Sequence, residues 1–152
     1  MSVAENIGFR RFDRHPFAFL RTLVSGRALR KQARDLIVEY GIRTPGPDAN
    51  IGSLSGGNVQ RAVLARELNE DVSLLIASNP CFGLDFAAVA EIRSRIMQAR
   101  NRGTAVLLIS ADLDEVFSLA DRIVVMSEGK AVHEVAIENA DLGVIGRHMA
   151  GH

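Results

Sequence analysis

Lysine is scarce in this sequence, and so are the residues that mark several other classes of protein. Only two of the 18 basic side chains are lysines, Lys31 and Lys130. The single cysteine, Cys81, excludes an internal disulfide framework and suits a reducing compartment. The 18 basic and 18 acidic residues cancel, which removes the general electrostatic case for nucleic-acid binding. No apolar run reaches the roughly 20 residues that span a bilayer.

Enough apolar sequence is present to build a core. The chain has 152 residues, of which 47% are apolar, so we expect a folded protein about one domain long. Charge is spread unevenly, because residues 1–50 carry nine basic and five acidic side chains and residues 51–152 carry nine and thirteen. We therefore expect two parts, a basic helical arm over residues 1–50 and a remainder over residues 51–152.

The first part has helical signals. Ser2 and Glu5 have the spacing of a capping box, which predicts a short helix as far as residue 10. Apolar residues recur on one face over residues 27–40, which predicts a second helix closed by Gly41. The basic side chains here are most simply a solvated face, and the alternative is a contact with a charged partner.

From residue 72 onwards, short apolar runs alternate with amphipathic segments. We predict strands at 72–77, 104–110, 122–126 and 130–137, the first of them buried, and helices at 86–102, 112–120 and 139–149. This alternation favours an α/β fold with βαβ units on a mostly parallel sheet, and with the last two strands as an antiparallel hairpin at one edge.

Residues 54–61, Leu-Ser-Gly-Gly-Asn-Val-Gln-Arg, stand where a loop turns into a helix predicted to end near Asn69. The hydroxyl of Ser55, the glycines Gly56 and Gly57, and the first helical amides suit a phosphate-sized anion, because those amides are unpaired and the helix dipole favours negative charge. The alternative is that Ser55 is an ordinary N-cap in an ordinary turn. These residues alone do not decide between the two interpretations.

The order of the later segments resembles the ATP-binding cassette of ABC transporters. Residues 54–61 look like the signature motif, 74–80 take the place of the Walker B strand, 83–85 resemble the D-loop, 107–112 the switch strand and H-loop, and 121–130 the closing hairpin. Residues 2–6, residues 44–48 and Asn58 look most like the second cassette of tandem sugar or nucleoside importers. The resemblance implies a partial P-loop NTPase fold.

The two lysines decide whether the sequence contains a P-loop, because that motif has the pattern G-x-x-x-x-G-K-[ST] and requires a lysine after a glycine. Only Lys130 follows a glycine, and Val124 and Ala131 occupy the positions of the other glycine and of the serine or threonine. This sequence therefore contains no P-loop. Since the family places its P-loop before the helical arm, the resemblance implies that the chain is the C-terminal part of a cassette.

Three further positions depart from the family pattern. Ser78 matches the Walker B aspartate, Asn79 the glutamate that polarises water, and Ala111 the H-loop histidine. Neither Ser78 nor Asn79 is a carboxylate, and a methyl group donates no hydrogen bond. The resemblance thus implies degenerate catalytic positions, no metal site of the chain's own, and no ATP hydrolysis by the chain alone.

The signature side of the site works in trans in this family, where two cassettes pair head to tail. Ser55, Gly56 and Gly57 are then expected to contact ATP held by another cassette, with Gln60 nearby and Mg²⁺ bound only through that partner. Asp85 belongs to the D-loop in this resemblance, and in the simpler interpretation it caps the helix that starts at residue 86. Both roles can coexist.

The resemblance also implies partners and a location. We expect another cassette and membrane permease subunits as partners, no nucleic acid, and a cytoplasmic location on the inner face of the cell membrane. One alternative is a non-catalytic interaction module whose contact uses Arg27, Arg30 and Arg34. Another is an inert remnant of a truncated gene, whose incomplete sheet exposes apolar surface. An incomplete core predicts that the isolated chain self-associates, swaps elements or is only marginally stable.

The remaining polar residues point to no further chemistry. The spacing of His133, His148 and His152 predicts no zinc site. Cys81 is expected to be a small, partly buried side chain.

Overall fold

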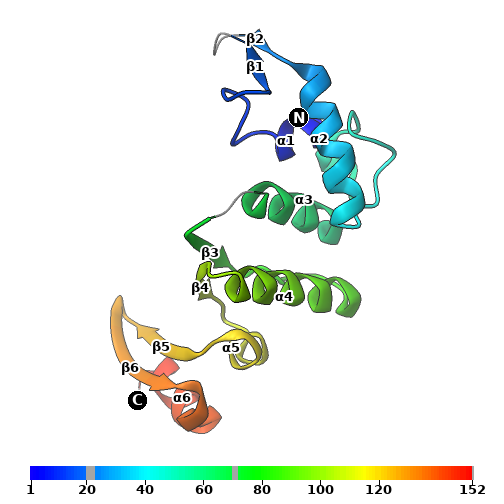
Figure 1. Cartoon of the computed structure of the whole chain (residues 1–152). Coiled ribbons are helices and arrows are strands. Elements are labelled where there is room, and N and C mark those ends of the chain that lie inside the picture. Colours follow the sequence, from blue (N-terminus) through cyan, green and yellow to red (C-terminus); the bar gives the residue numbers. More distant parts are fainter. Residues whose placement is uncertain (20–22, 70–71, 152) are drawn as a thin grey trace. The chain divides into compact units, whose positions relative to one another are not determined.

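The structure is a computed structural model that describes residues 1–19, 23–69 and 72–151. Figure 1 shows the order of its helices and strands along the chain. The chain divides into two compact units, of which the first is Met1–Leu75 with Pro80–Val106 and the second is Ile76–Asn79 with Leu107–His152. The expected division into an arm of residues 1–50 and a remainder of residues 51–152 stays a prediction.

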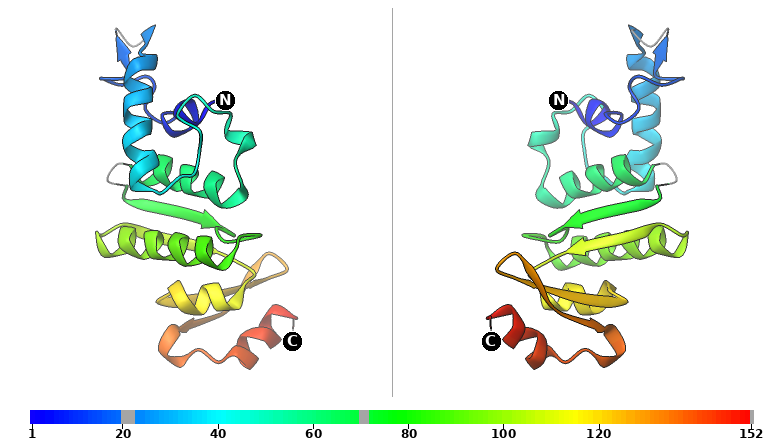
Figure 2. Two further views of the ribbon diagram at one scale, coloured as in Figure 1. Left: turned by 90° about the vertical axis from the view of Figure 1, so that its right-hand side faces the viewer. Right: turned by 90° about the vertical axis from the view of Figure 1, so that its left-hand side faces the viewer.

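The first unit begins with α1 (Val3–Ile7), which starts at the predicted capping box. The Ser2 hydroxyl accepts the Glu5 amide at 3.2 Å, and the Glu5 carboxylate accepts the Ser2 amide at 2.7 Å. The hydrogen bond that the Ser2 amide donates to the carboxylate lowers the pKa of the Glu5 carboxyl. The helix is shorter than predicted, because turns begin at Gly8. It contacts both α2 (Gly26–Glu39) and α3 (Gly56–Leu68), as Figure 2 shows.

The second predicted helix is confirmed as α2. Gly41 follows its end with a φ of +58°, in the left-handed region where glycine carries no steric penalty. A short hairpin before α2, β1 (Ala18–Phe19) with β2 (Leu23–Val24), is not predicted by the sequence analysis. Strands of two residues are too short for an alternating pattern to reveal them.

One further helix and two strands follow α3 along the chain. Helix α4 (Phe86–Asn101) packs against α3, and strands β3 (Leu74–Ser78) and β4 (Ala105–Ile109) form a small parallel sheet. The prediction that the first strand is buried is wrong in part. Leu75 and Ala77 are buried, whereas Leu74 is 54% and Ile76 61% exposed. Alternation of this kind belongs to a strand covered on one face only.

The second unit contains the remaining elements, α5 (Leu113–Leu119), β5 (Arg122–Ser127), β6 (Lys130–Ala136) and α6 (Leu142–Met149). Its core is built on Ile123, Val125 and Ile145, so α6 packs on β5. The antiparallel hairpin is confirmed, and its turn at Glu128 and Gly129 has two positive φ angles. The sequence places the hairpin at one edge of the parallel sheet, whereas in the structure it forms a two-stranded sheet of its own.

Short 3₁₀ helices lie at Ile51–Ser53 and Ile137–Asn139. Within the part of the chain that the structure describes, no helix is long and apolar enough to cross a membrane.

Candidate functional site

The loop before α3, which we call the signature turn (residues 54–57), differs from an ordinary helix start. Ser55 occupies the N-cap position, but its side chain accepts no backbone amide. Its hydroxyl instead accepts a hydrogen bond from the Asn58 side-chain amide at 2.9 Å. A serine at an N-cap usually satisfies one of the four orphan amides of the helix. The Ser55 side chain satisfies none of them at α3, and although the Asn58 amide donates to the Ser55 carbonyl, the Gly56 and Gly57 amides stay available to an outside acceptor.

The two glycines of the signature turn have different structural roles. A Cβ on Gly57 comes within 3.1 Å of the Ala88 Cβ, a tight contact, so glycine favours the close approach of α3 to α4 there. A Cβ on Gly56 meets only Leu84, at an ordinary 3.6 Å. Neither the Gly56 nor the Gly57 amide donates a hydrogen bond to any residue that the structure describes. Gly56 and Ser55 are exposed, so this edge of the first unit presents open backbone donors.

A buried polar network below the turn holds it in place. Asn58 is only 8% exposed, and its side-chain oxygen accepts the Arg43 amide at 2.7 Å. Arg61, one turn further along α3, pairs with Glu91 of α4 through Nε at 2.8 Å. In the sequence, Asn58 stands out only as a variant of a motif. Its role in the polar network could not be predicted, because its main partner, Arg43, lies fifteen residues away in the sequence, before the Thr44–Asp48 loop.

Asp85 lies next to the signature turn through its neighbour Leu84, which contacts Gly56. Its carboxylate accepts the Ala88 amide at 2.8 Å and caps α4, which confirms the simpler interpretation of this residue. Its role in a D-loop stays a prediction. Gln60 lies on the first turns of α3 and is half-buried. The first unit therefore brings together the residues expected to face ATP.

The three altered positions lie in the second unit, where β3 and β4 end. The Asn79 amide donates to the Ile109 carbonyl at 2.7 Å, and its side-chain oxygen accepts the Ala111 amide at 3.4 Å. Asn79 has a φ of +44°, a conformation that asparagine adopts more readily than most residues. The side chain of Asn79 thus joins two chain segments, and Ser78 precedes it at the end of β3.

No metal centre accompanies these residues. Across residues 1–19, 23–69 and 72–151, no three His, Cys, Asp or Glu side chains form a group that could hold a metal ion. His133 and His148 stack with their ring centroids 4.4 Å apart, and His152 lies outside the described residues. Cys81 is buried. The donors present at the signature turn fit an anion and do not fit a cation.

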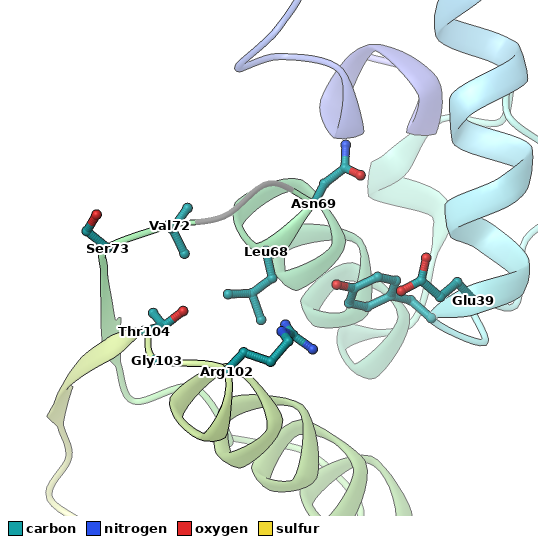
Figure 3. A pocket seen from close by; sticks show the side chains of 9 residues that line it. Glu39, Leu68, Asn69, Val72, Ser73, Arg102, Gly103 and Thr104 are labelled. Atoms are coloured by element: carbon teal, nitrogen blue, oxygen red, sulfur yellow. The ribbon is translucent and has the colours of Figure 1, made fainter.

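A pocket of about 510 Å³ lies at the other end of α3. It is lined by Glu39, Tyr40, Leu68, Asn69, Val72, Ser73, Arg102, Gly103 and Thr104. Figure 3 shows the Arg102 side chain extending from the end of α4 towards Leu68. Burial raises the pKa of the Tyr40 hydroxyl, and the Arg95 guanidinium lies 4.3 Å from the centre of the Tyr40 ring. Since α3 is roughly 18 Å long, the pocket is separate from the signature turn.

No model of a protein family matches the chain. Similar proteins nevertheless cover almost all of it. The glucose import ATP-binding protein TsgD13 of Haloferax volcanii is 41% identical over 153 residues, which are 99% of this chain and 28% of that protein. The guanosine import ATP-binding protein NupO of Bacillus subtilis is 38% identical over 149 residues, 98% of this chain and 29% of NupO. The chain thus spans less than a third of the length of these relatives.

Solved structures show the same arrangement of elements. A dimeric structure of MJ0796, described as a bacterial ABC transporter cassette, superposes with a TM-score of 0.72 at 21% identity. The match covers 90% of this chain and 57% of that one. A second dimeric structure of MJ0796, a post-hydrolysis state bound to ADP and Pi, gives the same values. At this level of identity the likeness concerns the fold.

Proposed function

Because the chain is homologous to part of the ATP-binding proteins of ABC sugar and nucleoside importers and has part of the cassette fold, we propose that it supplies the signature side of an ATP site. The other side, with the P-loop, belongs to another cassette. ATP lies between the two, and Mg²⁺ is bound through the partner. The proposal rests on one observation, the exposed signature turn whose serine leaves the helix amides uncapped.

The chemistry of the turn suits the terminal phosphate of ATP. The Gly56 and Gly57 amides and the Ser55 hydroxyl are donors or can become donors, and the positive end of the α3 dipole lies behind them. Asn58 and Arg61 hold the turn rigid, so little ordering is needed when the phosphate arrives. Binding by such a surface screens charge on the phosphate but moves no proton.

Hydrolysis requires groups that the chain lacks. The Asn79 side chain carries no negative charge, and its oxygen already accepts the Ala111 amide. It therefore cannot take a proton from water as a carboxylate would. We infer that the chain hydrolyses no ATP alone and that any turnover uses the carboxylate of a second cassette.

The proposal extends to location and partners. As part of an import ATPase, the chain works in the cytoplasm on the inner face of the cell membrane, against permease subunits contacted by the arm of residues 1–50. Sugars or nucleosides are the classes of solute that the names of the relatives support.

A chimera tests the proposal. The 149 matched residues of NupO are replaced by this chain in Bacillus subtilis, and guanosine import is measured. Substitution S55R places a bulky cation on the phosphate surface. Since hydrogen bonds to charged groups contribute about 1.5 to 3 kcal/mol each, import should fall by about tenfold or more. The matched control is S53R, at an exposed serine of the preceding 3₁₀ helix. Equal import by the S55R and S53R chimeras would exclude a phosphate contact at Ser55.

A further inference from the structure

The exposed side of α2 carries a row of basic side chains, Arg27, Lys31 and Arg34, which we call the basic ridge. Their spacing of four and three residues puts them on one face of the helix. The buried residues of α2, Leu29, Ala33 and Leu36, lie on the opposite face. The ridge therefore points directly away from the first unit.

The ridge differs from the other cations of the arm. Arg10 pairs with Glu67, Arg30 pairs with Asp48 at 2.8 Å, and Arg11 lies over the Phe17 ring. By contrast, no side chain among residues 1–19, 23–69 and 72–151 forms an ion pair or hydrogen bond with the ridge. The unneutralised positive charge of α2 is thus gathered on one line, about 10 Å long.

The ridge differs in one residue from the charged contact that the sequence suggested, which stays a prediction. That contact combined Arg27, Arg30 and Arg34, but Arg30 is neutralised by Asp48. Lys31 takes its place on the ridge. Asp35 follows Arg34 at the side of the ridge. Its negative charge partly offsets the positive charge of the ridge, but it does not point directly away from the first unit as the ridge does.

We propose that the basic ridge binds the anionic headgroups of a lipid bilayer. A headgroup layer needs only cations that reach one plane, and three long, exposed basic side chains on one helix face satisfy that need. A protein partner is normally held by buried aromatic or apolar anchors, and interface cores are poor in lysine. The ridge has no aromatic residue and no groove, so its chemistry matches lipid better than protein.

The ridge goes beyond the proposed function, because it requires neither ATP nor a second cassette. Each basic side chain near an anionic surface strengthens binding about fivefold. Three such residues give weak, salt-sensitive binding, which orients the arm on a membrane without anchoring the chain there irreversibly.

Vesicle cosedimentation with the full chain tests the proposal. The probes are vesicles of phosphatidylcholine alone and of phosphatidylcholine with phosphatidylglycerol. We expect binding to the anionic vesicles, loss of binding at high salt, and little binding to the neutral ones. The variant R27E/R34E should bind at least about 25-fold more weakly, because two attractive charges are lost. The assay contains neither ATP nor a second cassette, so failure here is distinct from failure of the ATP-site proposal.

The matched control is K130E/R147E, which makes the same change of net charge at two exposed residues of the second unit. Equal loss in this control and in R27E/R34E would mean that total charge and not the ridge decides binding, and the proposal would be wrong. It would also be wrong if R27E/R34E lost binding to a polyglutamate peptide but kept full binding to anionic vesicles.

If R27E/R34E does not fold, as judged by circular dichroism, D35K replaces it. This change adds positive charge beside the ridge and removes no contact described here. Binding to anionic vesicles should then strengthen by about 25-fold. Unchanged binding would overturn the proposal.

Discussion

The signature turn of the first unit and the altered positions of the second use their polar groups in opposite ways. At the signature turn, the Ser55 hydroxyl is turned away from the helix amides, and the Gly56 and Gly57 amides stay open. At the altered positions, the Asn79 amide donates to the Ile109 carbonyl of β4, and the Asn79 side-chain oxygen accepts the Ala111 amide. One region keeps donors for an outside ligand, while the other satisfies its polar groups internally. Under the proposed function, binding and catalysis are therefore separated within one short chain.

Both units also expose large apolar side chains. In the second unit, Ile76, Leu107, Ile109 and Met126 are all half-exposed or more. We expect this surface to drive self-association of the isolated chain, as the incomplete core predicted. The double variant L107E/I109E should shift the chain to monomer, as measured by sedimentation velocity. Loss of the burial of two apolar side chains costs about 3 kcal/mol of association free energy, which lowers the association constant about a hundredfold.

A matched change in the first unit sharpens this comparison. Val38 lies on α2 of the first unit and is 81% exposed. Its replacement in V38E should leave the sedimentation profile unchanged. A parent chain that sediments as a monomer at all concentrations would contradict the expectation outright.

The next largest effect concerns the packing of the signature turn. A methyl group on Gly57 meets the Ala88 Cβ at 3.1 Å, so G57A should destabilise the first unit by about 1 to 3 kcal/mol through overpacking. The matched control is G56A, where the nearest side chain is at an ordinary contact distance. Urea unfolding measures both. Equal urea midpoints for the two variants would show that α3 and α4 can move apart to accommodate a methyl group.

The polar support below the turn gives a related prediction. The variant N58L removes the acceptor of the Arg43 amide and leaves that group unsatisfied, which costs about 2 kcal/mol. Because Asn58 also donates to Ser55, the hydroxyl loses its partner and becomes free to cap α3. We therefore expect lower stability in urea unfolding together with weaker import by the NupO chimera. Lower stability with full import would separate the network from the phosphate surface.

Helix caps in the two units allow a test of Asp85. The variants D85A and D141A each remove an aspartate that accepts an amide at 2.8 Å, from Ala88 and Val144 respectively. Each should lower the free energy of unfolding by about 1 kcal/mol. If Asp85 also acts in a D-loop, only D85A reduces import in the chimera beyond its effect on stability. Identical import in the two chimeras would show that Asp85 only caps α4 and has no role in a D-loop.

The elements themselves follow from local sequence, and this explains which predictions succeed. The helix of α2 is set by the spacing of Leu29, Ala33 and Leu36, and the hairpin turn by Glu128 and Gly129. The exposure of Ile76 could not be foreseen, because an apolar run gives no sign of whether one face of its strand or both are covered.

The same limit applies to the site. The motif marks Ser55, Gly56 and Gly57, but the direction of the Ser55 hydroxyl depends on Asn58, and the position of Asn58 depends on Arg43. Such contacts join residues that no local pattern connects. The pocket beside Tyr40 and Arg102 is hidden for the same reason, since its lining comes from the ends of α2, α3 and α4.

The smallest expected effect comes from changing the altered positions. It shows whether these positions alone explain the expected lack of ATP hydrolysis. In the variant S78D/N79E/A111H, the carboxylates and the imidazole that the family pattern calls for are restored in the second unit. We expect no ATPase activity from the isolated chain, because no P-loop in this sequence holds the phosphates beside them. Glutamate at position 79 must also adopt a φ of +44°, which costs about 1 kcal/mol and lowers the unfolding midpoint slightly. Phosphate release above that of the parent chain would show that the second unit binds nucleotide by itself, and the separation of binding from catalysis would have to be abandoned.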